Sequence, residues 1–392
     1  MNIAELNSID WALLGAILLL FGVQVYWYSR YLAAPARKMR RDKNAKSQEP
    51  TANSQQPGVS IVLCAHNESE NLSHYLKALL TQDYPTYEVI VVDDGSEDGT
   101  RDIVEQFMVH DSRLHMTFVP KGARVGSTKK LGLTLGAKAA QYDYLLLTDA
   151  DCVPESNQWI REMMAGFGER LSVSGERRDI VLGFSPYFEE KGAVNRLVRY
   201  DTLFNGLHYL GAALCGHPYM GVGRNLAYKK SLFFESGGFT RLMTSKAGDD
   251  DLFVNHVATR DNTAVVLSRE SYIWSLSKKT FKEWWQQKWR HVSVSPQYRE
   301  ETKWRLMLEP LTRGLFYAMV VYIAVSYQLS VVSLAACGLF MVRWITQTAI
   351  INTSARRMGL SRFNMFTILW LDILLPLINL WMLIIPKKQT KW

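Results

Sequence analysis

The chain alternates between long apolar segments and a mixed region of short apolar runs. Residues 11–28 carry no formal charge and are long enough to cross a bilayer as a helix. From Val59 onwards, short apolar runs alternate with amphipathic stretches, and after Pro310 the chain becomes hydrophobic again. This pattern predicts a globular α/β region that lies between membrane segments.

The alternation in the middle of the chain predicts buried strands joined by helices. We expect strands at residues 59–64, 87–92, 114–119 and 142–148. We expect helices at residues 69–81, 98–109 and 127–140. This order of elements is typical of a mostly parallel, Rossmann-like sheet with helices on both faces. Ligands of such sheets bind beyond the carboxyl ends of the strands.

Three further membrane segments are predicted at residues 311–328, 329–351 and 364–385. Arg343 and Asp372 lie inside two of them, which indicates either an intramembrane ion pair, snorkelling side chains or a function in the membrane. Four full spans would place the basic residues 387–392 outside, against the positive-inside rule. We therefore expect one of the three segments to be re-entrant or interfacial.

The positive charge of the chain is concentrated beside its apolar segments. The 392 residues carry a net charge of +8, yet residues 47–302 carry −4, whereas residues 30–46 and 303–392 carry +6 and +8. This distribution favours a membrane over nucleic acid as partner, and the basic residues after the first span place that side in the cytoplasm. Four cysteines without paired spacing exclude a disulfide scaffold.

Acidic residues follow the first two predicted strands. The first strand ends in CAHNESENL, which contains Ala65 and Glu68, and the second ends in DDGSEDGT, which begins with Asp93 and Asp94. Capping of the next helices accounts for part of both stretches. Two adjacent carboxylates at a strand end also suit a ligand that donates hydrogen bonds, such as a ribose hydroxyl or a uracil N–H.

The fourth predicted strand ends in TDADCVP, where Asp149 and Asp151 flank Ala150. Two hard oxygen ligands at this spacing can hold Mg²⁺ or Mn²⁺, with diphosphate oxygens completing the coordination. Such a metal neutralises charge that develops on a departing diphosphate. Since the carboxyl ends of parallel strands meet at one edge of a sheet, we expect these acidic residues to share one site.

Three consecutive carboxylates, Asp249, Asp250 and Asp251, precede a later amphipathic stretch. An acidic helix N-terminus is one explanation, because negative charge is favourable there. Three carboxylates exceed what capping needs, so one of them is also a candidate general base that deprotonates a hydroxyl nucleophile.

Residues 281–291, FKEWWQQKWRH, form a basic, aromatic and amphipathic segment. Its tryptophans suit a membrane surface; they are Trp284, Trp285 and Trp289. Gln287 and Arg290 suit contacts with a diphosphate instead. The two interpretations are compatible on opposite faces of one helix.

Taken in order, CAHNE, VDDGSEDGT, TDAD, GDDDL and QKWRH resemble the family 2 inverting glycosyltransferases. The resemblance covers residues 58–292 and is strongest to membrane-anchored members with a Q-x-x-R-W signature. It implies a GT-A fold, a nucleotide-sugar donor with a UDP-sugar as the first expectation, and a divalent metal, Mg²⁺ or Mn²⁺. The domains expected are an anchor at 1–30, a basic segment and linker at 31–57, a GT-A domain at 58–300 and a C-terminal membrane region at 301–392 with two or three hydrophobic segments.

The resemblance also implies roles for individual residues. Asp94, beside Asp93, would hold the nucleoside, and Asp151 would be the main metal ligand of the pair Asp149 and Asp151. Asp249 would be the base, with Asp250 as the alternative, because the family's base lies three residues before a leucine. The donor-binding residues expected are Ala65, Glu68, Asp93, Asp94, Lys129, Asp149, Gln287 and Arg290.

Two features depart from the family pattern. His291 stands where the family has tryptophan, which argues against acceptor stacking as in polysaccharide synthases. Lys129 and Lys130 are displaced from the family's usual Gly-Lys, and they either meet phosphate or are solvated helix lysines. GVGRNLAY, in contrast, fits the family's strand that leads to the acceptor site, and the resemblance implies that Gly223 and Asn225 line this site.

These observations predict an integral protein of the plasma or inner membrane with a cytoplasmic catalytic domain. The expected reaction moves a sugar from a nucleotide-sugar to a hydroxyl of a lipid, a lipid-linked acceptor or a polysaccharide, with inversion. One alternative is a catalytically silent membrane protein that binds nucleotide-sugars. A transporter is a second alternative, motivated by Arg343 and Asp372.

Overall fold

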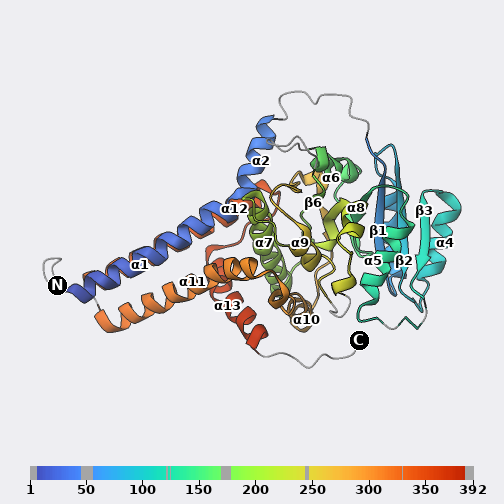
Figure 1. Cartoon of the computed structure of the whole chain (residues 1–392). Helices are drawn as coiled ribbons and strands as arrows, with labels where there is room; N and C mark the ends of the chain where they lie inside the picture. The colour runs from blue at the N-terminus through green and yellow to red at the C-terminus, as the bar shows by residue number, and fades with distance from the viewer. Residues whose placement is uncertain are drawn as a thin grey trace. The chain divides into compact units, whose positions relative to one another are not determined.

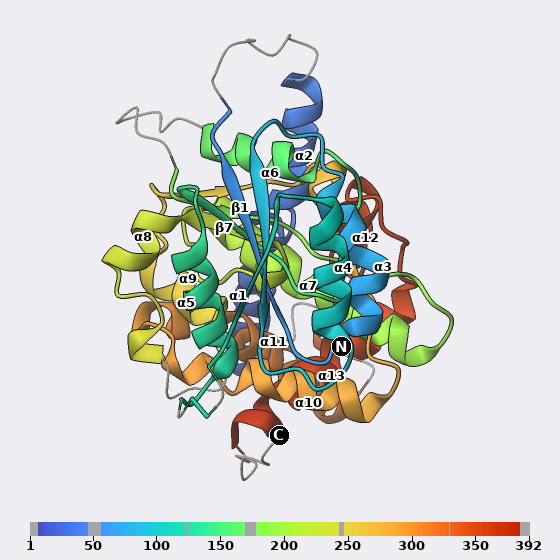
Figure 2. The ribbon, with the colours of Figure 1, turned by 90° about the vertical axis from the view of Figure 1, so that its right-hand side faces the viewer.

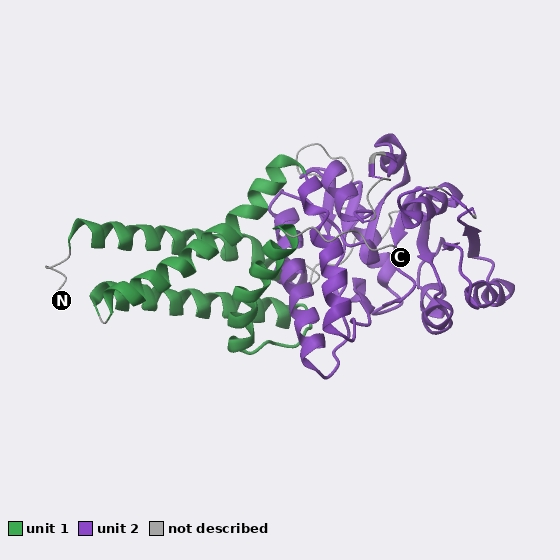
Figure 3. Ribbon diagram, turned by 90° about the horizontal axis from the view of Figure 1, so that it is seen from below, with its two compact units in different colours: residues 1–37, 299–392 green, residues 38–298 purple. Residues whose placement is uncertain are grey.

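The structure is a computed structural model. It describes residues 7–45, 56–120, 122–123, 125–168, 178–242, 247–328 and 330–384. The chain forms two compact units (Figure 3): residues 1–37 with 299–392 make a helical unit, and residues 38–298 make an α/β unit. Each unit has a hydrophobic core of its own.

A seven-stranded, mostly parallel sheet forms the centre of the α/β unit (Figure 1). Its order is β3-β2-β1-β4-β7-β6-β8, and only β7 runs antiparallel to its neighbours. The strands are β1 (Val59–Ala65), β2 (Tyr87–Asp93), β3 (Leu114–Phe118), β4 (Tyr144–Leu147), β6 (Ile180–Leu182), β7 (Leu226–Lys229) and β8 (Thr263–Val265). A small antiparallel sheet pairs β5 (Cys152–Pro154) with β9 (Ile273–Ser275). The predicted α/β class with a mostly parallel sheet is confirmed.

Helices connect and cover these strands. They are α3 (Ser69–Leu80), α4 (Thr100–His110), α5 (Thr128–Ala139), α6 (Trp159–Gly168), α7 (Ala193–Leu214), α8 (Lys230–Glu235), α9 (Asp251–Val257) and α10 (Phe281–Val292). Short 3₁₀ turns are η3 (Gly223–Asn225), η4 (Thr240–Leu242), η5 (Arg269–Ser271) and η6 (Ser295–Gln297). The four predicted strands and three predicted helices are confirmed, with ends that agree within two residues.

The two faces of the sheet bury alternate residues of each strand, as the twofold repeat of a strand requires. Ile61 and Leu63 of β1 join the core that contains residues of α3, α4 and α6. On the opposite face α5 lies close to β1 and β2 (Figure 2). A Cβ on Gly136 would come within 2.4 Å of Val62, and one on Gly132 within 2.9 Å of the Cys64 sulfur. These two glycines therefore let α5 approach the sheet closely, which fixes where its first residues lie.

The helical unit contains long apolar helices. They are α1 (Ser8–Trp27), α11 (Glu300–Tyr327), α12 (Val331–Arg357) and α13 (Met365–Ile384). A π-helical turn η2 (Tyr28–Leu32) and the basic helix α2 (Ala34–Ala45) follow α1, and the boundary between the two units falls within α2. Among the residues that the structure describes, four segments are long and apolar enough to cross a membrane: Ser8–Asn44, Glu300–Tyr327, Val331–Arg357 and Met365–Ile384. Each of the last three is one continuous helix. The re-entrant or interfacial placement of one of them stays a prediction, and residues 387–392 lie outside the described part of the chain.

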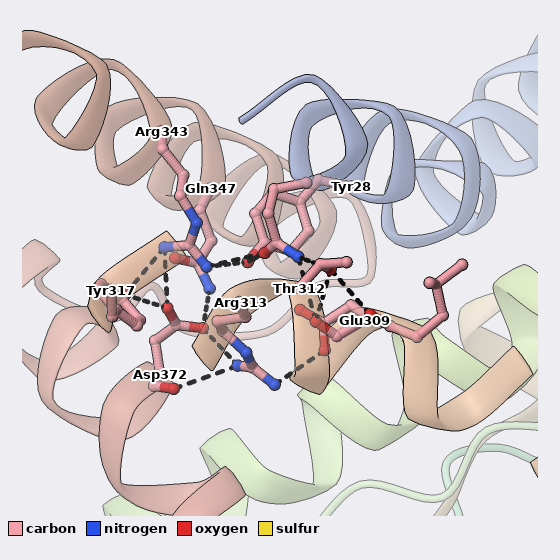
Figure 4. A network of polar contacts seen from close by, with 10 residues as sticks. Tyr28, Glu309, Thr312, Arg313, Tyr317, Arg343, Gln347 and Asp372 are labelled. Atoms are coloured by element: carbon pink, nitrogen blue, oxygen red, sulfur yellow. Dashed lines mark hydrogen bonds and ion pairs between the residues drawn. The ribbon is translucent and has the colours of Figure 1, made fainter. Parts of the chain in front are cut away.

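Buried charges of the helical unit pair with one another (Figure 4). Each carboxylate oxygen of Asp372, in α13, accepts a hydrogen bond from a different arginine. Arg343 of α12 donates at 3.0 Å and Arg313 of α11 donates at 2.6 Å. Arg313 also contacts Glu309 at 2.8 Å. Arg343 and Asp372 are 0% and 1% exposed. The predicted pairing of Arg343 with Asp372 is confirmed, and it explains the two charges that motivated the transporter alternative.

Neutral side chains extend this network to the first helix (Figure 4). Arg343 donates to Gln24 at 3.1 Å and also to the Tyr28 hydroxyl. The Gln24 amide donates to Thr312 of α11 at 2.8 Å. The network therefore connects α1 and η2 to α11, α12 and α13, which are far apart in sequence.

Replacing Asp372 by alanine should destabilise the helical unit, because two buried guanidinium groups would lose their shared counter-ion. Removing one partner of a buried ion pair costs about 3–5 kcal/mol. Thermal unfolding in detergent measures the effect, with Leu377→Ala as the control on the same helix, since Leu377 is 58% exposed. Equal shifts in melting temperature for the two variants would contradict the structural role of the network.

Candidate active site

The loops that follow β1 and β2 are fastened to each other. Asn67, which has a left-handed φ of 56°, donates its backbone N–H to Ser96 and accepts from the N–H of Glu97. The backbone N–H of Glu68 donates to Thr100 at 2.8 Å. These hydrogen bonds hold the loops that follow β1 and β2 against each other at one edge of the sheet.

Asp93 and Asp94 have different environments. Asp93 is 1% exposed and accepts hydrogen bonds from the N–H of Ser96 at 2.9 Å and from Arg101 at 3.0 Å. Burial alone would raise the pKa of Asp93, but Ser96 and Arg101 outweigh it and lower the pKa. Asp94 is partly exposed, and no side-chain hydrogen bond of it is found within the described ranges. The carboxylate with spare acceptor capacity is therefore that of Asp94.

The first strand contributes its end to the same place. The Ala65 carbonyl accepts from the N–H of Asp94 at 2.8 Å, which joins β1 to β2. Burial raises the pKa of the Cys64 thiol, and the carboxylates of Asp149, Asp249 and Asp94 raise it further. Three acidic residues from three segments therefore lie near enough to one thiol to influence its pKa.

Lys129, in the first turn of α5, lies between two of these acids. Its Nζ is 3.0 Å from Asp149 Oδ1 and 3.4 Å from Asp249 Oδ2. Burial would lower the pKa of Lys129, but the two carboxylates outweigh it and raise the pKa well above its usual range. The Lys129 side chain is 44% exposed, so it remains partly solvated while it contacts both acids, and the two alternatives for it stay open. The alternative of a solvated helix lysine is wrong for Lys130, which is 0% exposed and donates to the carbonyls of Leu242 and Ala247.

The three consecutive aspartates take three different roles. Lys129 keeps Asp249 ionised, because burial is outweighed and the pKa of Asp249 is lowered. Asp250 accepts from the backbone N–H groups of Gly223 and Asp251, each at 2.8 Å. Burial and the neighbouring Asp249 raise the pKa of Asp250 to about 6.

Asp251 faces the interior instead. It is 2% exposed and accepts from the Tyr298 hydroxyl at 3.1 Å. Burial and the charge of Asp250 raise the pKa of Asp251 to about 8. Asp251 is therefore protonated at neutral pH and anchors the start of α9.

Helix α10 begins with a capping box formed by Thr280 and Glu283. Lys288 fastens it to α7 through both oxygens of Asp201, at 2.7 and 2.9 Å. Trp284 is 2% exposed, so the predicted membrane surface is wrong for this tryptophan.

Two further residues of α10 contact or lie near groups of the site. Gln287 donates to the Tyr187 hydroxyl at 3.0 Å. The surrounding protein and the cation of Arg290 lower the pKa of His291 to about 4, with Asp249 acting in the opposite direction. His291 is therefore neutral at pH 7, and the end of the predicted Q-x-x-R segment lies near Asp249.

The segment around η3 differs from expectation at one residue. The Asn225 side chain is 1% exposed and bonds to the Trp159 indole, the Phe184 carbonyl and the Ser271 carbonyl. Its predicted place in the acceptor site is wrong, because its amide satisfies buried polar groups of the core. Gly223 does reach the site, through its bond to Asp250.

Three residues of the site were not predicted from the sequence: Tyr187, Arg224 and Tyr298. Tyr187 and Tyr298 lie in segments with no recognisable motif, so nothing in the sequence pointed to them. Arg224 stands in GVGRN between the two residues that were predicted to line the acceptor site, and its charge was an available signal.

The donor set fits a divalent cation in part. Asp149 and Asp151 offer the hard oxygens that Mg²⁺ and Mn²⁺ prefer. Among the residues that the structure describes, no cluster of three or more His, Cys, Asp or Glu side chains could hold a metal ion. A metal here would need further oxygens from a bound ligand.

Asp251 should make the stability of the α/β unit depend on pH. Its pKa is about 8 in the folded protein against an ordinary value of 3.8, so the folded state retains a proton that the unfolded state has lost. Stability therefore falls as the pH rises from the ordinary value through about 8. Asp251→Asn removes this titration, so its melting temperature should change less between neutral and alkaline pH than that of the wild type.

The control for this measurement is Asp83→Asn, because the Asp83 side chain is 58% exposed. This variant should keep the pH dependence of the wild type. A melting temperature of Asp251→Asn that falls with pH as steeply as the wild type's would show that another group titrates.

Comparison with known proteins gives related enzymes. The sequence profile of glycosyl transferase family 21 matches residues 24–392. Glycosyltransferase AglE of Haloferax volcanii is 30% identical over 151 residues, which are 38% of this chain and 46% of that protein. Chondroitin synthase of Escherichia coli is 26% identical over 223 residues, 50% of this chain and 31% of that protein. The chain therefore spans less than half the length of these relatives.

A solved structure shares the fold. The mannosyltransferase PcManGT from Pyrobaculum calidifontis, in complex with GDP-Man and Mn²⁺, aligns with a TM-score of 0.53 at 18% identity, over 88% of this chain and 99% of that chain. The GT-A-like fold expected from the sequence is thereby confirmed. The profile match extends over most of the described residues and over both compact units, so the chain belongs to glycosyl transferase family 21.

Proposed function

We propose that this glycosyltransferase moves a sugar from a nucleoside-diphosphate sugar to a hydroxyl of a lipid, lipid-linked or glycan acceptor, with inversion. The observation that carries the proposal is the position of the Lys129 ammonium, within 3.0 Å of Asp149 and 3.4 Å of Asp249. It brings the D-x-D segment and the candidate base to a single point, where donor and acceptor must meet for direct transfer.

The donor would lie across the carboxyl ends of β1, β2 and β4. Asp94 has the spare acceptor capacity for a nucleoside, and a UDP-sugar is the first expectation from the family 2 resemblance. The mannosyltransferase of similar fold was solved with GDP-Man. Lys129, Gln287 and Arg290 would contact the diphosphate, since charge-assisted hydrogen bonds to phosphate are strong. Ala65, Glu68 and Asp93 border the same edge and complete the proposed donor site.

A divalent cation, Mg²⁺ or Mn²⁺, would be held by Asp151 and Asp149 together with donor phosphates. When bound, it would neutralise charge on the departing diphosphate. The two carboxylates supply suitable oxygens, and the mannosyltransferase of similar fold was solved with Mn²⁺. The other steps of the proposed reaction would be carried out by side chains of this chain.

The transfer would be a single displacement. The acceptor oxygen forms a bond to the anomeric carbon while the bond from that carbon to the phosphate oxygen breaks. Asp249 takes the acceptor proton, and the diphosphate leaves with the bonding electron pair, near Arg290. Asp249 is favoured over Asp250 because both oxygens of Asp250 already accept backbone N–H groups. No nucleophile of the enzyme is needed, so the configuration inverts.

The acceptor would be bound beside a membrane. Four helices are long and apolar enough to span one, and the basic residues after the first favour a cytoplasmic site in the plasma or inner membrane. His291 in place of the family 2 tryptophan favours a lipid or lipid-linked acceptor over a long polysaccharide.

Purified protein in detergent, tested against a panel of nucleotide-sugars for donor hydrolysis, tests the proposal directly. Hydrolysis of one donor, followed by label that extracts into organic solvent with membrane lipids, would support it. Binding of nucleotide-sugars without transfer to any lipid or glycan would instead favour the catalytically silent binding protein.

Asp249→Asn should lower kcat by about 10²–10⁴-fold with little change in donor binding, because the general base is lost. Asp250→Asn should cost less, since a carboxamide oxygen still accepts one of the two backbone bonds. Initial rates at saturating donor compare the variants. If Asp250→Asn abolished transfer while Asp249→Asn retained it, Asp250 would be the base, and kcat would then fall as the pH drops through about 6.

Chelation of divalent ions should abolish transfer, and added Mg²⁺ or Mn²⁺ should restore it. Asp151→Asn should raise the metal concentration needed for half-maximal rate by at least about tenfold, since each carboxylate contributes strongly to a hard-cation site. Asp83→Asn, at an exposed carboxylate, serves as the matched control. Full activity in excess EDTA would remove the metal from the mechanism.

A further inference from the structure

Arg224 is a cation beside the site that lacks a complete set of partners. Its guanidinium carbon lies 4.4 Å above the centre of the Tyr187 ring. Its Nη2 is 3.5 Å from the Ser185 carbonyl, at the limit of a hydrogen bond. Its Nη1 is buried and has no hydrogen-bond partner within the described residues.

The ring contact does not satisfy this group. A cation–π contact uses the face of the guanidinium, whereas its N–H donors point outwards in its plane. A buried donor without a partner is unfavourable, more so when it carries charge. A purely structural arginine would be expected to reach a carbonyl or a carboxylate at good distance.

Arg224 also lies next to the proposed chemistry. Burial alone would lower the pKa of Arg224. The Tyr187 hydroxyl, the Cys152 thiol and the carboxylates of Asp151 and Asp149 outweigh burial, so the pKa is raised. No ion pair joins Arg224 to either carboxylate among the described residues, so its charge is near the D-x-D segment without being consumed by it. Arg224 stacks on the ring of Tyr187, and the hydroxyl of the same tyrosine accepts a hydrogen bond from Gln287 of α10.

The backbone that carries Arg224 is held on both sides. Gly223 donates its N–H to Asp250 at 2.8 Å. Asn225 is fixed by three buried hydrogen bonds, at 2.8 to 3.0 Å. A side chain presented from such a support is pre-organised, which lowers the entropy lost when it binds a ligand.

We propose that Arg224 is a phosphate-binding residue of this active site, held by Tyr187 so that its free donors meet a phosphate oxyanion. The planar guanidinium matches the spacing of phosphate oxygens, which a lysine ammonium does not. The oxyanion belongs either to the diphosphate of the donor or to a phosphate on a lipid-linked acceptor. This inference rests on the proposed function, because that function brings a phosphate to the site.

Arg224→Met and Arg224→Lys test the inference in the full-length protein in detergent. The first keeps the bulk of the side chain without its charge, and the second keeps the charge without the planar fork. Arg161→Met is the matched control, because Arg161 pairs with Asp83 at the surface and its side chain is 39% exposed. Melting temperatures establish that each variant is folded.

Calorimetric titration with UDP and with GDP, in the presence of Mn²⁺, measures the donor arm. Loss of charge-assisted hydrogen bonds should raise Kd by about 10- to 100-fold in Arg224→Met, with a smaller rise in Arg224→Lys. Uridine and guanosine, which lack phosphate, should bind wild type and variants alike. This outcome assigns Arg224 to the donor diphosphate.

Inhibition of donor hydrolysis by dodecyl phosphate, with dodecanol as the uncharged control, measures the acceptor arm. Unchanged binding of UDP and GDP with a loss of dodecyl phosphate inhibition of at least about tenfold would assign Arg224 to an acceptor phosphate. The inference is overturned if a folded Arg224→Met or Arg224→Lys matches the wild type in both arms. Failure of the wild type itself to hydrolyse or bind any nucleotide-sugar would overturn the proposed function instead.

Discussion

The site depends on a cation that holds carboxylates together where they would otherwise repel. Asp149 follows a central strand and Asp249 comes from a distant loop, yet both lie within ion-pair distance of the Lys129 ammonium. Like charges at such separations are unfavourable in a partly buried place. The ammonium lies there because α5 packs closely on β1 and β2 through Gly132 and Gly136. The close packing of α5 on the sheet therefore determines that the carboxylates of Asp149 and Asp249 share a cation.

The helical unit obeys the same rule. Asp372 accepts from two arginines of different helices, and Arg313 also pairs with Glu309, so positive and negative groups balance. In an apolar surrounding an unpaired charge is so costly that pairing dictates which helix faces meet. Gln24 and Tyr28 bring the first helix into the same arrangement. A charged cluster that looked anomalous in the sequence is thus what specifies the helix packing.

The sequence predicted those features that repeat along the chain. Strands β1 to β4 and helices α3 to α5 follow from the spacing of apolar residues, and the carboxylates of Asp94 and Asp149 follow from where those strands end. Contacts between distant segments leave no such periodic signal. Tyr298 below Asp251, and Tyr187 beside Gln287, are set by tertiary packing alone. The prediction for Asn225 was wrong because a polar side chain near a site can equally serve buried backbone groups.

Four cations of the α/β unit differ in how completely protein groups pair with them. Lys288 is matched by both oxygens of Asp201, and Lys130 by two carbonyls, so each holds one element against another. Lys129 and Arg224 are different, since one is shared between two acids and the other rests on an aromatic face. A cation whose donors are all paired with protein groups must lose those bonds before it can bind an anion. A cation that is shared between partners or stacked on a ring can bind an anion with a smaller loss of free energy. We therefore expect Lys129 and Arg224, whose protein partners are shared or incomplete, to be able to meet a phosphate beside the D-x-D segment, together with Arg290.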